Sequence, residues 1–158
     1  MLNCLKIRDL AIVEELTLDL GPGLNVLTGE TGAGKSVLVG ALELVLGGKA
    51  KAELVRSGAA AGEVEALFEV GGDSPVREQL RALNLGGSDE LVVRRVVSSS
   101  GRARAYVNGK LATQQMLAEL TRGLADISSQ HEHHTLTDPR THLGYLDAFG
   151  GLAALCER

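Results

Sequence analysis

The stretch Gly29-Glu30-Thr31-Gly32-Ala33-Gly34-Lys35-Ser36 decides how the rest of this sequence is interpreted. It fits the phosphate-binding pattern G-x-x-x-x-G-K-[ST] at every fixed position. In such a loop the glycines let backbone N–H groups point at phosphate oxygens, and Lys35 would reach the β- and γ-phosphates. Ser36 would offer its hydroxyl to Mg²⁺, and the following helix adds its positive N-terminal end. The stretch Gly29–Val37 therefore predicts a site for the phosphates of a nucleotide and for Mg²⁺.

The segments on either side of the loop have the character that the motif requires. Leu24–Thr28 is short and largely apolar, which predicts a buried strand. Val37–Leu46 is apolar almost all round, which predicts a helix packed on both sides, and Gly47-Gly48 would end it. A glycine-rich turn without a ligand is the alternative, and the agreement of motif with context disfavours it.

Length and composition limit the classes of protein to consider. The chain has 158 residues, enough for one domain, and 3% aromatic residues, so its core should be aliphatic. The formal net charge of −4 gives no general attraction to nucleic acid, so any basic surface must be local. Cys4 and Cys156 form no metal-ligand pattern and predict unpaired thiols. No apolar run is long enough to span a membrane, and we expect a cytoplasmic protein.

The remaining periodicity predicts more strands than helices. Asn108-Gly109 is a strong hairpin-turn signal, Ser74-Pro75 and Thr113 are helix starts, and Asp138-Pro139 begins a last helix. The expected fold is α/β, a mixed sheet in which an antiparallel meander flanks a phosphate-loop core. The expected strands are Met1–Leu10, Glu15–Leu20, Glu63–Val70, Leu91–Val97 and Arg102–Val107.

The groups that would complete ATP hydrolysis are missing from this sequence. A phosphate-loop hydrolase needs an apolar strand that ends in Asp for the metal, usually followed by a Glu that polarises water. No aspartate of this chain has that context: Asp89 follows Gly-Gly-Ser, Asp126 follows a weak apolar run, and Asp147 lies in the last expected helix. The general base is therefore not recognisable here.

Several tracts together resemble the SMC-like branch of the ABC ATPases, and the resemblance covers essentially the whole chain. They are an early strand pair that includes Ile7–Glu14, the phosphate loop, an arginine-rich hairpin that closes on Tyr106–Gly109, and a downstream tract Asp126–His133. In that family a long antiparallel coiled coil splits the ATPase head. The N-terminal part carries the phosphate loop and a glutamine loop, and the C-terminal part carries the signature motif, the aspartate and the catalytic glutamate.

The resemblance implies that this chain is the N-terminal lobe of such a head. Residues 1–138 would form the lobe, and residues 139–158 a helix leading toward the coiled coil, which would start within Leu143–Leu155. The expected partners are the C-terminal half of the same head, a second head joined across ATP, and DNA bound without regard to sequence. The expected role is an ATPase in DNA double-strand-break repair and recombination at the nucleoid.

The resemblance also carries over individual site residues. Gln130 would bind Mg²⁺ and orient water, so that Lys35 and Gln130 are the expected catalytic residues. Ser129 stands where the family pattern has glycine, and a loop glutamine without a role is the alternative. Arg8 is a candidate for base and ribose contacts. Arg56 is a candidate to lie close to nucleotide or DNA, with a solvated surface charge as the alternative. His131, Glu132, His133 and His134 lack the spacing of a zinc site.

Basic residues gather on the expected hairpin. Alternation places Arg102 and Arg104 on one face, where they could meet a DNA backbone. The alternative is a sheet edge kept soluble by charge. The DNA candidates are Arg94, Arg95, Arg102, Arg104 and Lys110.

A second class of function stays open from the sequence, a self-contained phosphate-loop enzyme such as a nucleotide kinase or a transporter-type ATPase. A kinase should carry lid arginines and an acceptor site after the loop, and neither pattern is present. A transport ATPase would need a signature motif such as L-S-G-G-Q, which is absent from this sequence.

Overall fold

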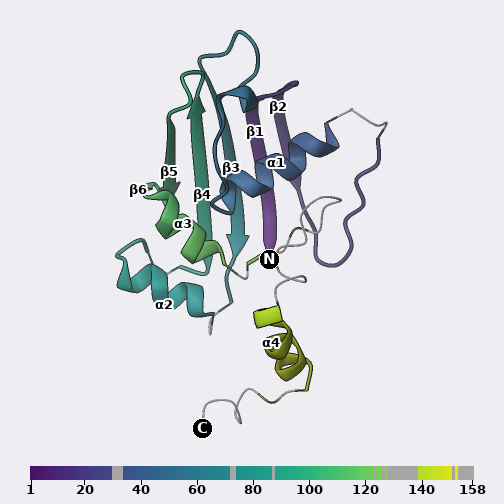
Figure 1. Ribbon diagram of the computed structural model, residues 1–158, viewed down its shortest axis with the longest axis vertical. Coiled ribbons are helices and arrows are strands. Elements are labelled where there is room, and N and C mark those ends of the chain that lie inside the picture. Colours follow the sequence, from purple (N-terminus) through teal and green to yellow (C-terminus); the bar gives the residue numbers. More distant parts are fainter. Residues whose placement is uncertain are drawn as a thin grey trace. The chain divides into compact units, whose positions relative to one another are not determined.

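The computed structural model describes residues 1–29, 34–71, 74–86, 88–122, 124–125, 127, 139–150 and 152. The chain divides into two compact units, Met1–Ala125 and Asp126–Arg158. The first unit contains the sheet and the helices that cover it (Figure 1). The second contains helix α4 (Pro139–Gly150), whose apolar residues Leu143, Leu146 and Phe149 are exposed. No helix among the described residues is long and apolar enough to cross a membrane.

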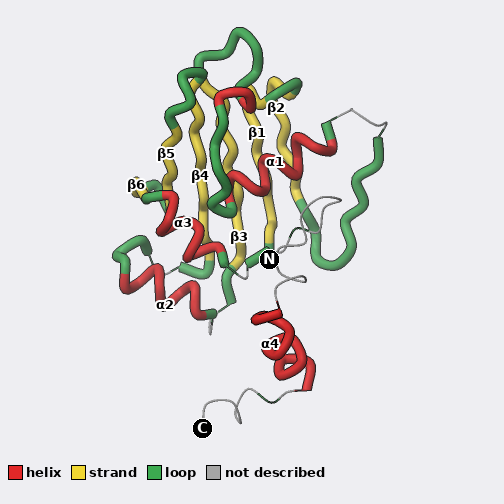
Figure 2. Tube along the Cα trace, viewed as in Figure 1, coloured by secondary structure: helices red, strands yellow, loops and turns green. Residues whose placement is uncertain are grey.

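The first unit is built on a six-stranded sheet with the strand order β2-β1-β3-β4-β5-β6. Each neighbouring pair of these strands is antiparallel, so the expected antiparallel meander is confirmed. Short hairpins join β1 to β2, β4 to β5 and β5 to β6, whereas β1 pairs with β3 across a long insertion that holds the phosphate loop (Figure 2). The strands are β1 (Leu2–Leu10), β2 (Val13–Asp19), β3 (Ala61–Glu69), β4 (Glu90–Ser98), β5 (Ala103–Val107) and β6 (Lys110–Ala112).

The two faces of the sheet differ because successive side chains in a strand point to opposite sides. The face that carries the helices is apolar, and its central side chains are Ile7, Val64, Val93 and Val107, each 1% exposed or less. On the outer face the register aligns Lys6 with Glu65, Glu65 with Arg94, and Arg94 with Tyr106. The outer face is therefore a row of charged and polar side chains in contact with solvent.

The helices of the first unit lie on the apolar face (Figure 1). Helix α1 (Lys35–Val45) packs on β3 and β4, helix α3 (Gln114–Thr121) packs on β5, and helix α2 (Pro75–Ala82) packs on α3. A short 3-10 helix, η1 (Ala52–Leu54), follows α1. The expected N-caps form: the Ser74 hydroxyl accepts from the N–H of Val76, and the Thr113 hydroxyl from that of Met116.

The expected buried strand at Leu24–Thr28 is wrong. These residues belong to no strand, and the side chains of Leu24 and Val26 are 89% and 69% exposed. Their apolar character favours burial, but a strand is buried only where a neighbouring strand takes up its N–H and C=O groups. Among the described strands none lies beside this segment, so it runs through solvent in the structure.

Candidate nucleotide-binding site

The phosphate loop ends at Gly34, which caps α1 in a left-handed conformation. Its φ is 95°, a region that glycine enters without steric cost, and a Cβ there would meet no atom within 4 Å. Backbone conformation rather than crowding therefore requires glycine at this position. The carbonyl of Gly34 accepts from the N–H of Val37 at 3.0 Å and of Leu38 at 3.1 Å. Because the first N–H groups of a helix have no partner within it, those of Lys35 and Ser36 remain available to an anion.

Lys35 is the first residue of α1, and its ammonium group joins the two ends of the loop. Nζ donates a hydrogen bond of 2.5 Å to the carbonyl oxygen of Gly29. This bond uses one of the three donors of an ammonium group, and the described residues supply no acceptor for the others. The lysine is thus held at the end of the loop by its bond to Gly29.

The electrostatic surroundings of this helix end favour a negative ligand. The first turn of α1 contains no acidic residue, and both Lys35 and Ser36 are exposed. The helix dipole adds partial positive charge at the same end. The site therefore combines accessibility, a lysine and oriented backbone donors, which are the elements needed to hold phosphate groups.

The other end of α1 anchors this site on the sheet. Ala41, Leu44 and Val45 are fully buried against the apolar face. Gly47 has a φ of 93°, and the N–H of Gly48 donates to the carbonyl of Glu43 at 2.8 Å, so the expected glycine cap forms. The prediction that Val37–Leu46 packs on both sides is only partly right, because Glu43 is exposed and Val37–Gly40 are only partly buried.

Arg8 lies on the outer face of β1, away from the face on which α1 packs. Its Nη2 is 3.0 Å from Oε1 of Glu15 on β2, and this carboxylate raises the pKa of the Arg8 guanidinium. Both side chains are exposed. The structure does not bring Arg8 together with Lys35.

Arg56 lies beside the turn between β1 and β2. Its Nη2 is 3.2 Å from Oε2 of Glu14 and its Nη1 is 3.8 Å from Oδ1 of Asp9. The backbone N–H of Arg56 donates to the carbonyl of Asp9 at 2.9 Å. Both the side chain and the backbone of Arg56 therefore hold this turn, a role that the sequence did not indicate.

Other expected site residues lie outside the described residues. These include Gln130, the four histidine and glutamate residues that follow it, and Glu30–Ala33 of the phosphate loop. Among the residues that are described, no group of three or more His, Cys, Asp or Glu side chains is placed to hold a metal ion.

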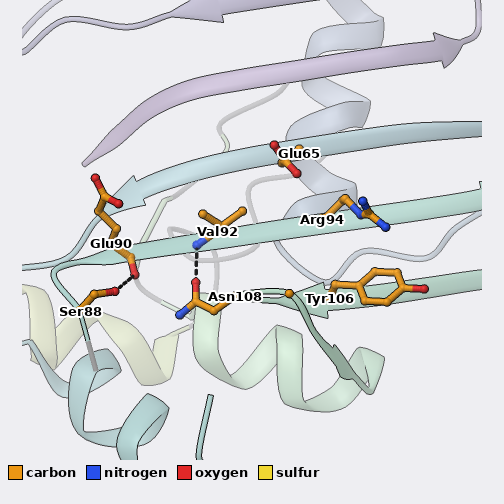
Figure 3. A pocket seen from close by; sticks show the side chains of 8 residues that line it. Glu65, Ser88, Glu90, Val92, Arg94, Tyr106 and Asn108 are labelled. Carbon is orange, nitrogen blue, oxygen red and sulfur yellow. Dashed lines mark hydrogen bonds between the residues drawn. The ribbon is translucent and has the colours of Figure 1, made fainter. Parts of the chain in front are cut away.

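The basic hairpin forms one wall of a cleft on the outer face of the sheet (Figure 3). The cleft has a volume of about 520 Å³, and Val92 lies at its centre, between Glu65 and Asn108. The guanidinium carbon of Arg94 lies 4.8 Å from the centroid of the Tyr106 ring, a cation–π contact. Arg94 Nη1 also lies 3.8 Å from a carboxylate oxygen of Glu63. Arg94 is thus held by contacts with both neighbouring strands.

The five DNA candidates do not form one patch. Arg102 and Arg104 are exposed, and the described residues offer neither of them an ion-pair partner. Arg95 points to the opposite face and is 2% exposed. Lys110 Nζ donates to the carbonyl of Asn84 in the loop after α2. The structure brings Arg94, Arg102 and Arg104 to the outer side of the hairpin and leaves Arg95 apart from them.

Asn108 has a role that the sequence revealed only in part. The Asn108-Gly109 turn forms as expected, with φ values of 47° and 77°. In addition, Oδ1 of Asn108 accepts from the N–H of Val92 at 2.8 Å, and Nδ2 donates to the carbonyl of Leu85 at 3.0 Å. The turn therefore fixes the loop between α2 and β4 as well as the hairpin.

Comparison with known proteins shows the family to which this chain belongs. A family model described as AAA domain matches residues 4–137. The DNA repair protein RecN of Halalkalibacterium halodurans is 44% identical over 152 residues, and that of Bacillus subtilis is 45% identical over 152 residues. These alignments cover 96% of this chain and 27% and 26% of the relatives. The chain thus spans about a quarter of the length of the curated relatives it matches.

Solved structures agree on the fold. A chain from work on ATP-driven dimerization and DNA stimulated activation of SMC ATPases superposes with a TM-score of 0.64 at 22% identity and covers 77% of each chain. The SMC head domain from Thermotoga maritima superposes with a TM-score of 0.58 at 20% identity, covering 75% of this chain and 41% of that one. The expected fold, an α/β lobe of the SMC-head type, is confirmed.

Proposed function

The chain belongs to the AAA domain family, and from this premise we propose that it is the ATP-binding N-terminal lobe of an SMC-like ATPase head acting in DNA double-strand-break repair and recombination. The similarity to proteins named as DNA repair proteins supports the process. The observation that carries the proposal is the exposed start of α1, where Lys35 joins the loop ends and no acidic residue lies nearby in the helix.

The residues of this chain fit an ATP–Mg²⁺ complex. The backbone of Gly29–Val37 would surround the phosphates, and Lys35 would contact the β- and γ-phosphate oxygens. The Ser36 hydroxyl and the Gln130 amide oxygen are hard oxygen ligands of the kind that Mg²⁺ prefers. When bound, Mg²⁺ supplies neutralisation of phosphate charge during transfer to water.

A second segment of protein completes the head in this proposal. The exposed apolar side chains of Leu24, Val26 and Leu27 support it, because they have the character of a strand that lacks its neighbours. We assign those neighbours to the C-terminal half of the same head, which would also supply the metal-binding aspartate and the catalytic glutamate. Residues 1–138 would then form the lobe, and residues 139–158 would lead toward a coiled coil.

DNA binding is assigned to the outer side of the hairpin. Arg102 and Arg104 are exposed cations without carboxylate partners among the described residues, which supports contacts with a phosphate backbone. Arg94 adds a third cation that Tyr106 and Glu63 hold in place. The complete protein would bind DNA without regard to sequence. It would act at the nucleoid in the cytoplasm. Two heads would pair with ATP bound between them.

The test is ATP affinity measured by isothermal titration calorimetry in the complete protein with Mg²⁺ present. Lys35→Ala should abolish detectable binding, because it deletes the charge directed at the β/γ-phosphates. Lys49→Ala removes an exposed lysine beyond the other end of α1 and is the matched control, expected to bind ATP normally. ATP affinity that is unchanged in Lys35→Ala contradicts the proposal.

A further inference from the structure

The C-terminal end of α1 is held by side chains from two other elements of the fold. The three successive carbonyls of Leu46, Gly47 and Gly48 each accept a side-chain donor. Thr121 Oγ1 lies 3.0 Å from the oxygen of Leu46 and 2.9 Å from that of Leu117 in its own helix, so its one proton is shared between the two carbonyls. Gln114 Nε2 donates to the oxygen of Gly47 at 3.1 Å. Both donors come from α3, which packs beside this end of α1 (Figure 1).

Arg95 of β4 supplies the third donor. Its Nη2 lies 3.4 Å from the carbonyl oxygen of Gly48. Gly48 lies three residues beyond Val45, the last residue of α1, next to the helix end that carries partial negative charge, so a cation is favourable there. Side-chain donors from strand β4 and helix α3 thus bind the residues that follow α1 and oppose movement of the helix along its axis.

The fit at this end of α1 leaves little space for movement. A Cβ at Gly47 would lie 2.7 Å from the Cα and the Cβ of Ala118 in α3, and a Cβ at Gly48 would lie 2.7 Å from the carbonyl oxygen of Glu43. Gly47, two residues after α1, therefore packs closely against the backbone of α3 at Ala118. A shift of α1 along its axis would break the three side-chain bonds and this contact together.

Stability alone does not account for a guanidinium at residue 95. The side chain is 2% exposed, and no residue in the described part of the chain supplies a hydrogen-bond partner for its Nε and Nη1. Burial lowers the pKa of the guanidinium, as expected where the charged form has lost water. An apolar side chain of similar size often stabilises a protein at such a position. What the guanidinium adds is a directed bond to the end of α1.

We propose that Arg95 is a positioning residue for the nucleotide site: with Gln114 and Thr121 it sets the axial position of α1, and so the place where Lys35 and Ser36 meet the phosphates. The inference rests on the proposed nucleotide-binding function. An α-helix is a stiff rod that rises 1.5 Å per residue. Displacement at its C-terminal end therefore reappears at its N-terminal end, where hydrogen-bond distances to phosphate tolerate only a few tenths of an ångström.

The experiment compares ATP affinity with thermal stability in the complete protein. Arg95→Met keeps an unbranched, apolar chain over the first four atoms of the side chain and removes every donor. We expect its ATP dissociation constant, measured with Mg²⁺, to rise about tenfold, while the melting temperature without nucleotide stays the same or increases. Arg95→Lys retains a cation and a donor and should recover part of the affinity. Arg81→Met removes an exposed arginine from α2, a helix to which no binding role is assigned, and should change neither quantity.

The two possible failures are distinguishable. If Arg95→Met binds ATP as tightly as the unaltered protein, or loses affinity only in step with its melting temperature, the positioning role is wrong. If Arg95→Met does not fold, Gln114→Ala combined with Thr121→Val removes the other two bonds, and unchanged ATP affinity in that variant overturns the inference. If Lys35→Ala also binds ATP normally, the proposed nucleotide site itself has failed.

Discussion

Arg94 and Arg95 are consecutive in β4, and their guanidinium groups lie on opposite faces of the sheet. Arg94 is stacked over Tyr106 at 4.8 Å on the outer face, whereas Arg95 is buried and donates to the carbonyl of Gly48. Strand alternation separates the two charges, so two arginines adjacent in the sequence contact different parts of the molecule. Arg94 is therefore a residue of the solvent-exposed face, and Arg95 is a residue of the interior.

Reversing the charge of Arg102 and Arg104 together should weaken DNA binding for all sequences. Each lost phosphate contact lowers the slope of log affinity against log salt by about 0.9, so the slope should fall by about 2. The measurement is fluorescence anisotropy with two unrelated duplexes at several salt concentrations. Arg81→Glu with Arg122→Glu changes the net charge equally at exposed positions elsewhere and should leave the slope unchanged. If the two double variants show the same slope of log affinity against log salt, the arginines of the hairpin serve only to keep the sheet edge soluble.

Gln130→Ala in the complete protein should leave ATP binding intact and reduce turnover. The amide is expected to orient Mg²⁺ and water rather than to hold the nucleotide. Calorimetry gives the affinity, and a phosphate-release assay gives the turnover. Gln79→Ala, at an exposed position in α2, is the control. Parallel loss of binding and turnover in Gln130→Ala would point to a role in folding.

This chain by itself should hydrolyse ATP very slowly or not at all. The phosphate loop can hold phosphates, but no aspartate or glutamate of the sequence has the context to complete transfer to water. Addition of the C-terminal half of the head should restore phosphate release, with a rate that rises more than linearly with protein concentration as heads pair. Rapid turnover by the chain alone, abolished by Lys35→Ala, would favour a self-contained enzyme instead.

Gly47→Ala should destabilise the fold by about 2–4 kcal/mol, because it combines a strained backbone with a collision against Ala118. Gly58→Ala is a matched control, since Gly58 has a φ of 87° and open space around it. That variant should cost only about 1 kcal/mol, the penalty of the left-handed conformation. Urea denaturation measures the free energy of unfolding of both variants. Equal losses of stability would show that α1 and α3 can separate without cost.

The thiol of Cys4 should react slowly with iodoacetamide at pH 8. Partial burial raises its pKa, and Asp19, its neighbour across the β1–β2 pair, raises it further through a hydrogen bond and charge repulsion. Less of the reactive thiolate is therefore present at a given pH. Asp19→Asn in a Cys156→Ser background should speed alkylation by lowering that pKa. An unchanged rate would mean that burial alone controls this thiol.

Much of the lobe is predictable from sequence because each strand has one buried face. Alternation in β3 and β5 assigns Val64, Phe68 and Val107 to the core, and the structure agrees. The burial of Arg95 was also predictable, since it shares a face with Val93 and Val97. The prediction that Arg95 is a DNA-contacting residue was therefore wrong, because strand alternation already places its side chain on the buried face.

Other features depend on contacts between distant segments and have no local signal. The pairing of β1 with β3 and the capping of α1 by Gln114 and Thr121 join residues far apart in the chain. The segment Leu24–Thr28 failed as a strand for a related reason. Its composition favours burial, but burial requires a neighbouring strand, which the described part of the chain does not supply.

The pairing of β1 with β3 also sets the order in which the lobe assembles. During synthesis β1 and β2 leave the ribosome before β3 and can already form their hairpin. Completing the sheet must wait until β3 has emerged, because Leu2 pairs with Phe68 across the whole phosphate-loop insertion. Closing so long a loop is entropically slow, so β1 and β2 should join the locally built β4–β5–β6 layer late in folding.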